Sequence, residues 1–385
     1  MALANYNQKE SKNVVYFFLI YFGLSFFVND TGMDSVRYAQ MFQHNATLPL
    51  TEFFRIIGGL YSDTSIDIAE PFISFLVSRF TDNYKFLFAA YAAVYGFFYL
   101  KSIELLYEKY RQNAGLNAWI FMFFFITTLS INNINGFRMW TALWVFFYGA
   151  SQVILYEKRK YLLLALCSIL IHGSFISANF VLIIYVIAGN RNLIYLIVAI
   201  SSFILPNILL PFFDTISLRL GGGYRAKYLG YSNEDLVSSL QERSQQASWF
   251  LPLSKELVFY YFLFMIILIY YLLKDRVKER SENNLFNFLL LFLSFVNFAK
   301  PIPAFGGRFQ ILFILFATLF VFLYFIKLPT AKLHLLTVLG IFPMLLYTAV
   351  QFRIGSETIN SWIFMPAFGL PLFVPGISLA EFLFR

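Results

Sequence analysis

Charged residues and cysteine are what this sequence has least of. Only 13% of its 385 residues are charged, whereas a soluble globular protein carries roughly 25%. This deficit excludes an ordinary soluble domain. The 59% share of hydrophobic residues and a mean hydropathy of +0.67 indicate an integral membrane protein instead. The single cysteine, Cys167, lies inside an apolar run, so no disulfide framework can form within one chain.

The basic residues are spread along the chain, although the net charge is +8. They occur in short connectors between apolar stretches, which is the positive-inside pattern of a multi-pass membrane protein. Membrane insertion and anionic headgroups account for this charge, so no nucleic-acid partner is predicted. The connectors are Lys9/Lys12, Lys109/Arg111, Lys158/Arg159/Lys160, Arg191, Lys274/Arg276/Lys278/Arg280 and Lys327/Lys332.

The apolar stretches predict an all-α polytopic membrane protein of about twelve spans, because about 20 apolar residues cross a bilayer as a helix. We expect one integral membrane domain, 1–385. Residues 160–189 fit either one long span or two short ones. Two spans place every basic connector and both termini on the cytoplasmic side, with His172 near the tip of a hairpin. The stretches are 14–29, 84–106, 117–134, 137–156, 160–172, 173–189, 192–213, 255–273, 285–299, 308–326, 333–350 and 361–380.

This topology leaves two long segments on the outer face, 30–83 and 214–254. The first holds seven of the 21 acidic residues. It also contains two amphipathic pieces, 50–60 and 68–80, which we expect as interfacial helices. The second carries a run of three glycines, 221–223, among basic residues.

One candidate catalytic group is Asp34, which follows the first predicted span together with Arg37 and Tyr38. A carboxylate at the membrane surface can act as a general base for a hydroxyl when burial or partners tune its pKa. The alternative is a solvated loop or a helix cap.

A second candidate is Arg138, which opens a predicted span after the Asn-rich turn that contains Asn135. Arginine binds phosphate through its planar fork, and a helix N-terminus favours an anion. The alternative is a snorkelling interfacial arginine.

A third candidate is His172, because ionisable groups inside a membrane are functional candidates. The alternative is a satisfied polar contact. The other histidines, His44 and His334, are distant in sequence, so we predict no metal site and no cofactor.

Further cations lie on the predicted outer face, where basic residues are disfavoured. A lipid-borne pyrophosphate would explain them, because such cations bind and stabilise that leaving group. The alternative is that long loops translocate regardless of charge. Two of these cations flank the turn 301–307, which would hold them near one another. The set is Arg219, Arg225, Lys227, Arg243, Lys300, Arg308 and Arg353.

Several short motifs follow one another in a recognisable order. They are Gly32-x-Asp34-x-x-x-Tyr38, Glu70-Pro71-Phe72, Arg138 after the Asn-rich turn, the basic turn Lys158–Lys160, Ile171-His172-Gly173-Ser174 and Gly307-Arg308-Phe309. This order resembles the EpsG family, which is similar to Wzy-type polysaccharide polymerases. The resemblance covers roughly residues 14–190, and beyond them it rests on the last motif and the general layout. The residue after Arg138 is Met139, where the family often has glutamine.

This resemblance implies a GT-C-like glycosyltransferase of the bacterial inner membrane. It would join undecaprenyl-pyrophosphate-linked oligosaccharide units on the outer leaflet, with a chain-length regulator as a possible protein partner. The implied catalytic residues are Asp34, Glu70, Arg138 and His172. Pyrophosphate binding is expected from Arg138, Arg225, Lys300 and Arg308, and other substrate contacts from Arg37, Tyr38, Asn135 and Arg219.

Three other functions stay open from the sequence. A flippase for the same lipid-linked oligosaccharide would place charges along a cavity at mid-membrane depth. A membrane acyltransferase would need a catalytic histidine reached from the cytoplasmic side, and the predicted topology puts His172 on the opposite side. A scaffold of a synthase complex is the third alternative.

Overall fold

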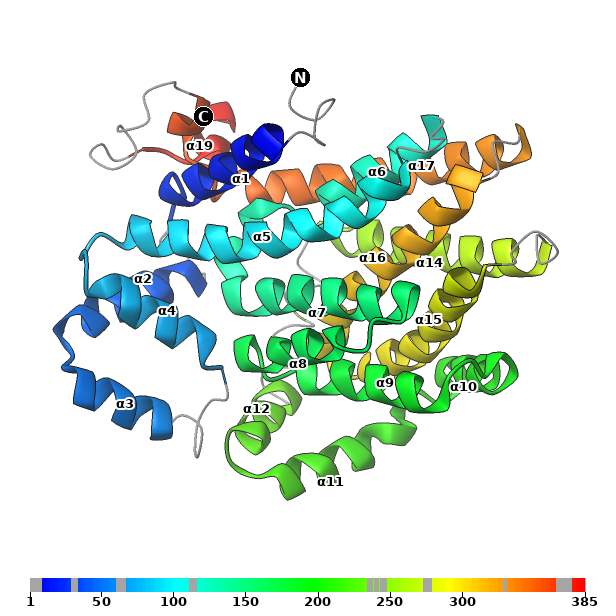
Figure 1. The fold of residues 1–385 in the computed structure, drawn as a ribbon, viewed down its shortest axis with the longest axis horizontal. Helices are drawn as coiled ribbons and strands as arrows, with labels where there is room; N and C mark the ends of the chain where they lie inside the picture. The colour runs from blue at the N-terminus through cyan, green and yellow to red at the C-terminus, as the bar shows by residue number, and fades with distance from the viewer. Residues whose placement is uncertain are drawn as a thin grey trace.

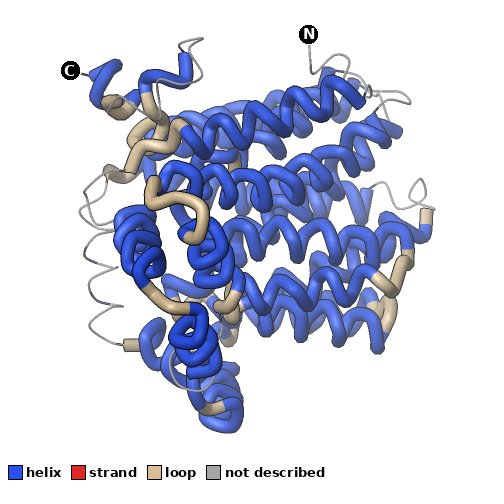
Figure 2. The backbone as a smooth tube through the Cα atoms, turned by 60° about the vertical axis from the view of Figure 1, so that its left-hand side comes forward, coloured by secondary structure: helices blue, strands red, loops and turns tan. Residues whose placement is uncertain are grey.

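The computed structural model describes residues 9–28, 34–59, 67–110, 116–233, 248–272, 279–327, 331–364 and 376–384, together with residues 238 and 242. Within these ranges the chain is helical and forms no regular strand (Figures 1 and 2). Isolated bridges pair Phe26 with Ile359 and Asn360 with Ser378, so the end of the chain lies beside the first helix. The all-α prediction is confirmed.

The described helices follow one another through short connections. Several are long and run nearly side by side, whereas shorter helices lie around this stack, with α2–α4 at the left and α11 and α12 at the bottom of Figure 1. They are α1 (Lys9–Leu24), α2 (Asp34–Thr47), α3 (Leu50–Gly59), α4 (Ala69–Ser78), α5 (Tyr84–Tyr110), α6 (Leu116–Thr128), η2 (Ile131–Gly136), α7 (Phe137–Tyr156), α8 (Tyr161–Ile171), α9 (Phe175–Ala188), α10 (Asn192–Ile204), η3 (Pro206–Leu209), α11 (Leu210–Leu220), α12 (Gly222–Ser232), α14 (Phe250–Leu272), α15 (Arg280–Ala299), α16 (Pro303–Lys327), α17 (Ala331–Gly355), η5 (Ser361–Phe364) and α19 (Leu379–Phe384).

Fewer helices than expected are long and apolar enough to cross a membrane. By length and composition five stretches qualify: Tyr84–Glu108, Leu116–Tyr156, Phe250–Tyr271, Phe305–Ile326 and His334–Gly355. A sixth is counted only if the pair Asn192–Ile204 and Pro206–Arg219 is one span, and that pair bends by 101°. The predicted span 192–213 is thus divided between two helices at an angle, and its crossing of the membrane stays a prediction. The total of about twelve stays a prediction, and most of the predicted span 361–380 lies outside the described residues.

The centre of the molecule is α16, whose apolar residues are buried on nearly every side. A helix that is apolar all round belongs in such an interior position. Peripheral helices behave differently: Phe17 of α1, Ile197 of α10 and Phe342 of α17 are exposed, as expected of helices that face lipid.

Residues 160–189 form two helices, α8 and α9, joined by a tight turn at His172 and Gly173. His172 ends α8 with an extended backbone, φ −148° and ψ 112°. The hairpin packs closely on α7, because a Cβ on Gly149 would lie 2.8 Å from the backbone nitrogen of Ala165. The predicted hairpin with His172 near its tip is confirmed.

The long helices have two distinct ends. The ring of Tyr91 in α5 stacks on that of Phe137 in α7, with centroids 4.0 Å apart. Further along both helices, the ring of Tyr99 packs edge-on against Trp144, with centroids 5.2 Å apart, so α5 and α7 run parallel. Their first turns lie beside α2 and α4 at one end, called the site end below (Figure 1).

The opposite end, called the connector end, carries the described basic connectors. Lys12 pairs with Glu104 near the end of α5 at 3.1 Å, and Glu157 pairs with Arg280 after the end of α7 at 2.6 Å. The chain therefore gathers these connectors at one end of its helices. Lys274, Arg276 and Lys278 lie outside the described residues.

Candidate functional site

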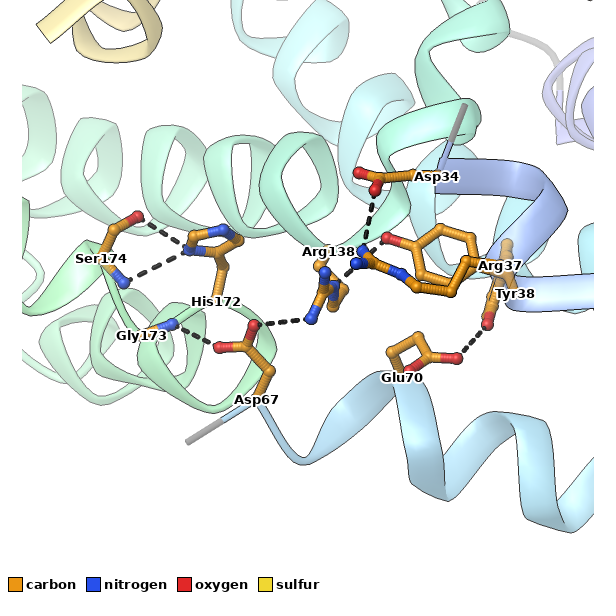
Figure 3. A network of polar contacts seen from close by, with 10 residues as sticks. Asp34, Arg37, Tyr38, Asp67, Glu70, Arg138, His172, Gly173 and Ser174 are labelled. Atoms are coloured by element: carbon orange, nitrogen blue, oxygen red, sulfur yellow. Dashed lines mark hydrogen bonds and ion pairs between the residues drawn. The ribbon is translucent and has the colours of Figure 1, made fainter. Parts of the chain in front are cut away.

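A polar cluster at the site end joins α2, α4, α7 and the α8–α9 turn (Figure 3). These elements are far apart in sequence, and the fold brings them together because α4 packs on α5, α7 and α8. The cluster consists of Asp34, Arg37, Tyr38, Asp67, Glu70, Tyr91, Arg138, His172, Gly173 and Ser174.

Arg138 is at the centre of this cluster, in the first turn of α7. Its Nη1 lies 3.3 Å from Oδ2 of Asp67, and its Nε donates a hydrogen bond to the hydroxyl of Tyr38 at 3.2 Å. The arginine side chain is 25% exposed, whereas that of Asp67 is 1% exposed. One edge of the guanidinium is thus held inside the protein, and part of it stays accessible.

Asp67 links Arg138 to the α8–α9 turn. Its Oδ1 accepts a hydrogen bond from the backbone N–H of Gly173 at 2.8 Å (Figure 3). The next residue, Ile68, donates its N–H to the carbonyl oxygen of Leu170 at 2.8 Å. Two hydrogen bonds therefore hold the segment before α4 against the α8–α9 hairpin. The carboxylate of Asp67 pairs with the Arg138 guanidinium and also accepts from a backbone amide.

The sequence had pointed to Asp67 only as one of seven acidic residues. A signal was present, because Asp67 and Glu70 are three residues apart at the start of an apolar helix. Groups at that spacing project from the same side of a helix. Two acids side by side at the start of an apolar segment could have been recognised as a pair.

Glu70 is 2% exposed, and its Oε1 accepts a hydrogen bond from the hydroxyl of Tyr91 at 2.8 Å. Burial raises the pKa of Glu70, although the Tyr91 hydrogen bond and the charge of Arg138 both lower it. A carboxyl in such a place is a stronger base than an exposed one once it is ionised.

Tyr38 is 1% exposed and lies against Tyr91 edge-on, with ring centroids 5.7 Å apart. Burial raises the pKa of Tyr38 to about 12, against the opposing effect of Arg138. Its hydroxyl is therefore neutral near pH 7. The predicted substrate contact Tyr38 is a buried partner of Arg138.

Asp34 and Arg37 form the exposed rim of the cluster. Arg37 donates to Oδ1 of Asp34 at 2.8 Å within the first turn of α2, and both side chains are about half exposed. The N–H of Ser35 donates to Oδ1 of Asn135 at 3.3 Å, so Asn135 holds the start of α2 against η2. Gly32, the first residue of the motif, lies outside the described residues.

His172 is 5% exposed, and its ring contacts the turn that follows it. Nδ1 lies 2.7 Å from Oγ of Ser174 and accepts from the N–H of Ser174 at 3.3 Å. Nδ1 is thus the acceptor, which puts the proton of a neutral ring on Nε2. Among the described residues, no group of three or more His, Cys, Asp and Glu side chains is placed to hold a metal ion.

Arg225 and Lys300, which were predicted to act with Arg138, pair with acids outside its cluster. Arg225 of α12 pairs with Asp214 and donates to Oγ of Ser217 at 2.8 Å. Lys300 lies 3.5 Å from Oε2 of Glu256, whose Oε1 accepts from Gln310 at 3.1 Å. Each of these two cations is thus paired with an acid on another helix, α11 or α14.

Two more predicted cations lie on α16 and α11. Arg308 is half-buried in α16, and Arg219 is exposed in the last turn of α11. Arg243 and the side chain of Lys227 lie outside the described residues.

An apolar groove with an empty volume of about 620 Å³ begins at the α8–α9 turn. Gly173 and Ser174 belong both to this groove and to the polar cluster. Its other walls come from α9, α11, α12 and the turn between α15 and α16, with Phe213, Tyr228 and Phe305 among them. Arg225, Lys300 and Arg308 are carried by the same elements. Apolar surface and a polar cluster thus meet at one turn.

Comparison with known proteins gives one family. The model of the EpsG family matches residues 13–364, which is most of the chain, so the chain belongs to the EpsG family. This family consists of Wzy-like exopolysaccharide and O-antigen polymerase-type proteins. Together with the apolar helices, the match indicates a multi-pass membrane protein with a polymerase-like role. Neither the curated proteins nor the solved structures give a significant match.

Proposed function

We propose that this member of the EpsG family is a polysaccharide polymerase of the bacterial inner membrane. It would join undecaprenyl-pyrophosphate-linked oligosaccharide units at the outer face. The observation that carries the proposal is the buried Glu70 beside the Arg138–Asp67 pair, at the end of the helices opposite the basic connectors. By the positive-inside rule that end faces away from the cytoplasm.

Glu70 is the general base in this proposal, and Asp34 belongs to the exposed rim of the cluster. An exposed carboxylate paired with Arg37 has the properties of an ordinary surface acid. Glu70 is buried and has a raised pKa, which suits proton transfer from a sugar hydroxyl. Asp34 and Arg37 would then contact the sugar by hydrogen bonds.

The proposed step is a glycosyl transfer. The hydroxyl oxygen of one lipid-linked unit forms a bond to the anomeric carbon of the other chain, and the bond from that carbon to the pyrophosphate oxygen breaks. The hydroxyl proton passes to Glu70, and the leaving group is undecaprenyl pyrophosphate. The accessible edge of Arg138 would stabilise charge that develops on that leaving group.

Asp67 and the hairpin turn would orient Arg138 rather than react. Because Asp67 binds both Arg138 and the N–H of Gly173, the guanidinium has one fixed position relative to the turn. His172 lies in the same turn, and its Nε2 proton would donate to a phosphate or an acceptor oxygen. Preorganised donors of this kind need little rearrangement as charge develops.

The apolar groove is the proposed path for a polyprenyl chain. It meets the polar cluster at Gly173 and Ser174, so a lipid lying there would present its pyrophosphate near Arg138. Arg225, Lys300 and Arg308 lie on the elements around it and would bind phosphate oxygens as the lipid enters or leaves. The lipid-linked donor and acceptor, and a chain-length regulator, are the predicted partners.

A flippase is the main alternative and would need charged groups along a path through the membrane. The polar cluster instead lies at the site end of the helices, which favours chemistry at one membrane face.

The deciding experiment expresses wild type and Arg138→Ala at matched membrane levels in cells that lack the native protein, and resolves polymer length on a gel. We expect a ladder with wild type and single lipid-linked repeat units with the variant. The proposal fails if wild type changes only how much lipid-linked unit reaches the outer leaflet, because that result identifies a flippase.

A further inference from the structure

A second polar cavity lies at the connector end, opposite the candidate site. It has an empty volume of about 610 Å³ and lies between the end of α7, the α9–α10 connection and the first turns of α15. Its lining combines two arginines, a glutamate, two asparagines and a tyrosine with a few small apolar surfaces. The lining residues are Val153, Glu157, Arg159, Tyr185, Val186, Gly189, Asn190, Arg280 and Asn284.

One wall of this connector-end cavity is held by a hydrogen-bonded chain. Glu157 has φ 54°, which makes it the one described non-glycine residue with a left-handed backbone. Its Oε1 lies 2.6 Å from Nε of Arg280 and accepts from Asn284 at 3.2 Å. Asn284 in turn accepts from Nδ2 of Asn190 at 2.7 Å. This backbone conformation is a helix cap at the end of α7, and the hydrogen-bonded chain fixes the positions of Glu157, Asn284 and Asn190.

The charge around the cavity favours an anion. Arg159 and Arg280 line it against one carboxylate, that of Glu157. The adjoining sequence adds three cations, Lys158, Lys160 and Arg191, and two acids, Glu279 and Glu282. Five cations against three carboxylates leave a positive surplus. Arg280 meets Glu157 through Nε, and a guanidinium carries two Nη groups besides.

The cavity lies at the level where lipid headgroups are expected. It begins where α7 ends, at the last residue of a stretch that is long and apolar enough to span the membrane. Tyrosines gather at the same level, and three of them hydrogen-bond residues of the α9–α10 connection or the start of α10. Basic pockets between membrane helices on this side recognise anionic headgroups. The tyrosines are Tyr156, Tyr161, Tyr185, Tyr195 and Tyr270.

We propose that the connector-end cavity binds the phosphate headgroup of an anionic phospholipid. Arg159 and Arg280 bind the phosphate oxygens through their planar forks, and the amide of Asn190 contacts the glycerol part of the headgroup. Glu157 fixes Arg280 in place. The inference does not depend on the proposed polymerase function, because the lipid is a bound component at the other end of the molecule.

The test measures lipid binding by native mass spectrometry of the purified full-length protein in detergent, titrated with phosphatidylglycerol or phosphatidylcholine. We expect wild type to prefer phosphatidylglycerol. Each arginine removed is expected to weaken that binding about fivefold, since a basic residue near an anionic lipid contributes about 1 kcal/mol. Arg159→Gln with Arg280→Gln should therefore weaken it about 25-fold.

The matched control is Arg55→Gln with Arg353→Gln, which removes the same charge from exposed ion pairs on α3 and α17. It should leave the phosphatidylglycerol preference unchanged. Arg159→Gln alone keeps the Arg280–Glu157 pair. Weaker lipid binding by this single variant therefore cannot result from loss of that pair, even if the double variant folds poorly.

Two results would overturn the proposal. One is equal weakening by the cavity variants and the control variants. The other is glycerol phosphate displacing the lipid at an equal concentration, because the cavity would then be a site for soluble anions.

Discussion

Helix α7 carries a polar cluster at each of its ends, and the two clusters differ in kind. At its first turn Arg138 is paired with a carboxylate that is 1% exposed; after its last turn Glu157 is paired with Arg280, which is 79% exposed. The connector-end pair belongs to a cation-rich surface, as membrane insertion predicts. The site-end pair has no such explanation, because a cation there opposes the insertion rule and needs a buried acid beside it.

Under the proposed function, this contrast separates charge that serves membrane insertion from charge that serves chemistry. Two arginines and three acids make up the site-end cluster, so it is balanced when Glu70 is protonated. If Glu70 acts as the proposed general base, it must first be ionised, and its raised pKa then makes the carboxylate a better proton acceptor. The connector end holds exposed cations, which suits reversible contact with anionic lipids.

The largest expected effect comes from Arg138→Ala, which leaves Asp67 buried without its cation. Breaking a buried pair by removing one partner costs roughly 3–5 kcal/mol, so unfolding in detergent should occur at a clearly lower temperature. Arg280→Ala is the matched control at the other end of α7. It should cost no more than about 1 kcal/mol, since its partner stays in water. Equal losses in the two variants would remove the distinction between the ends.

Asp67→Asn should have the next largest effect, and it should act on activity more than on folding. Asparagine can still accept the N–H of Gly173 but no longer neutralises Arg138. We expect polymer formation to fall by roughly 10-fold or more, the usual cost of losing an orienting partner. A double variant with Arg138→Gln should be no less active than Arg138→Gln alone, because the two residues act as a unit. Additive losses would show that Asp67 works without Arg138.

Glu70→Gln tests the pH dependence. The folded protein raises the pKa of Glu70, so the fold favours the neutral carboxyl. Wild type should therefore lose stability as pH rises from the ordinary glutamate pKa through the raised value, and the glutamine variant should not. Polymerase activity should rise over the same window, because the base must be ionised. Thermal unfolding and polymer synthesis across pH provide both readouts.

Asp34→Asn should have the smallest effect of the four on stability. Its ion pair with Arg37 is half exposed, and such pairs contribute about 0–1 kcal/mol. Activity should fall only by the loss of one substrate hydrogen bond. An unfolding temperature lowered as far as in Arg138→Ala would show that Asp34 is part of the buried cluster.

The sequence pointed to some members of the polar cluster and not to others. Arg138 and His172 stood out because each is a polar group in or beside an apolar helix, and Glu70 because it belongs to a motif that resembles the EpsG family. Asp67 did not, since its importance comes from Arg138, which lies 71 residues away, and no local pattern records that contact. Arg225 and Lys300 were expected to act with Arg138, but each pairs with an acid on another helix, Asp214 of α11 and Glu256 of α14.

The fold was predictable where apolar runs are bounded by clear turns. The α8–α9 hairpin follows from the short polar break at His172, and α3 and α4 from amphipathic pieces. The bend between α10 and α11 was missed because the residues around Pro206 are as apolar as their neighbours. Hydropathy records how apolar a segment is and carries no information on its direction.

The most direct test of the account compares Glu70→Gln with Asp34→Asn for polymer length, at matched membrane levels in cells that lack the native protein. The account predicts that Glu70→Gln leaves single repeat units on lipid, whereas Asp34→Asn still makes a ladder, with shorter or fewer chains. A normal ladder from Glu70→Gln with none from Asp34→Asn would place the base at the exposed rim and contradict the central claim.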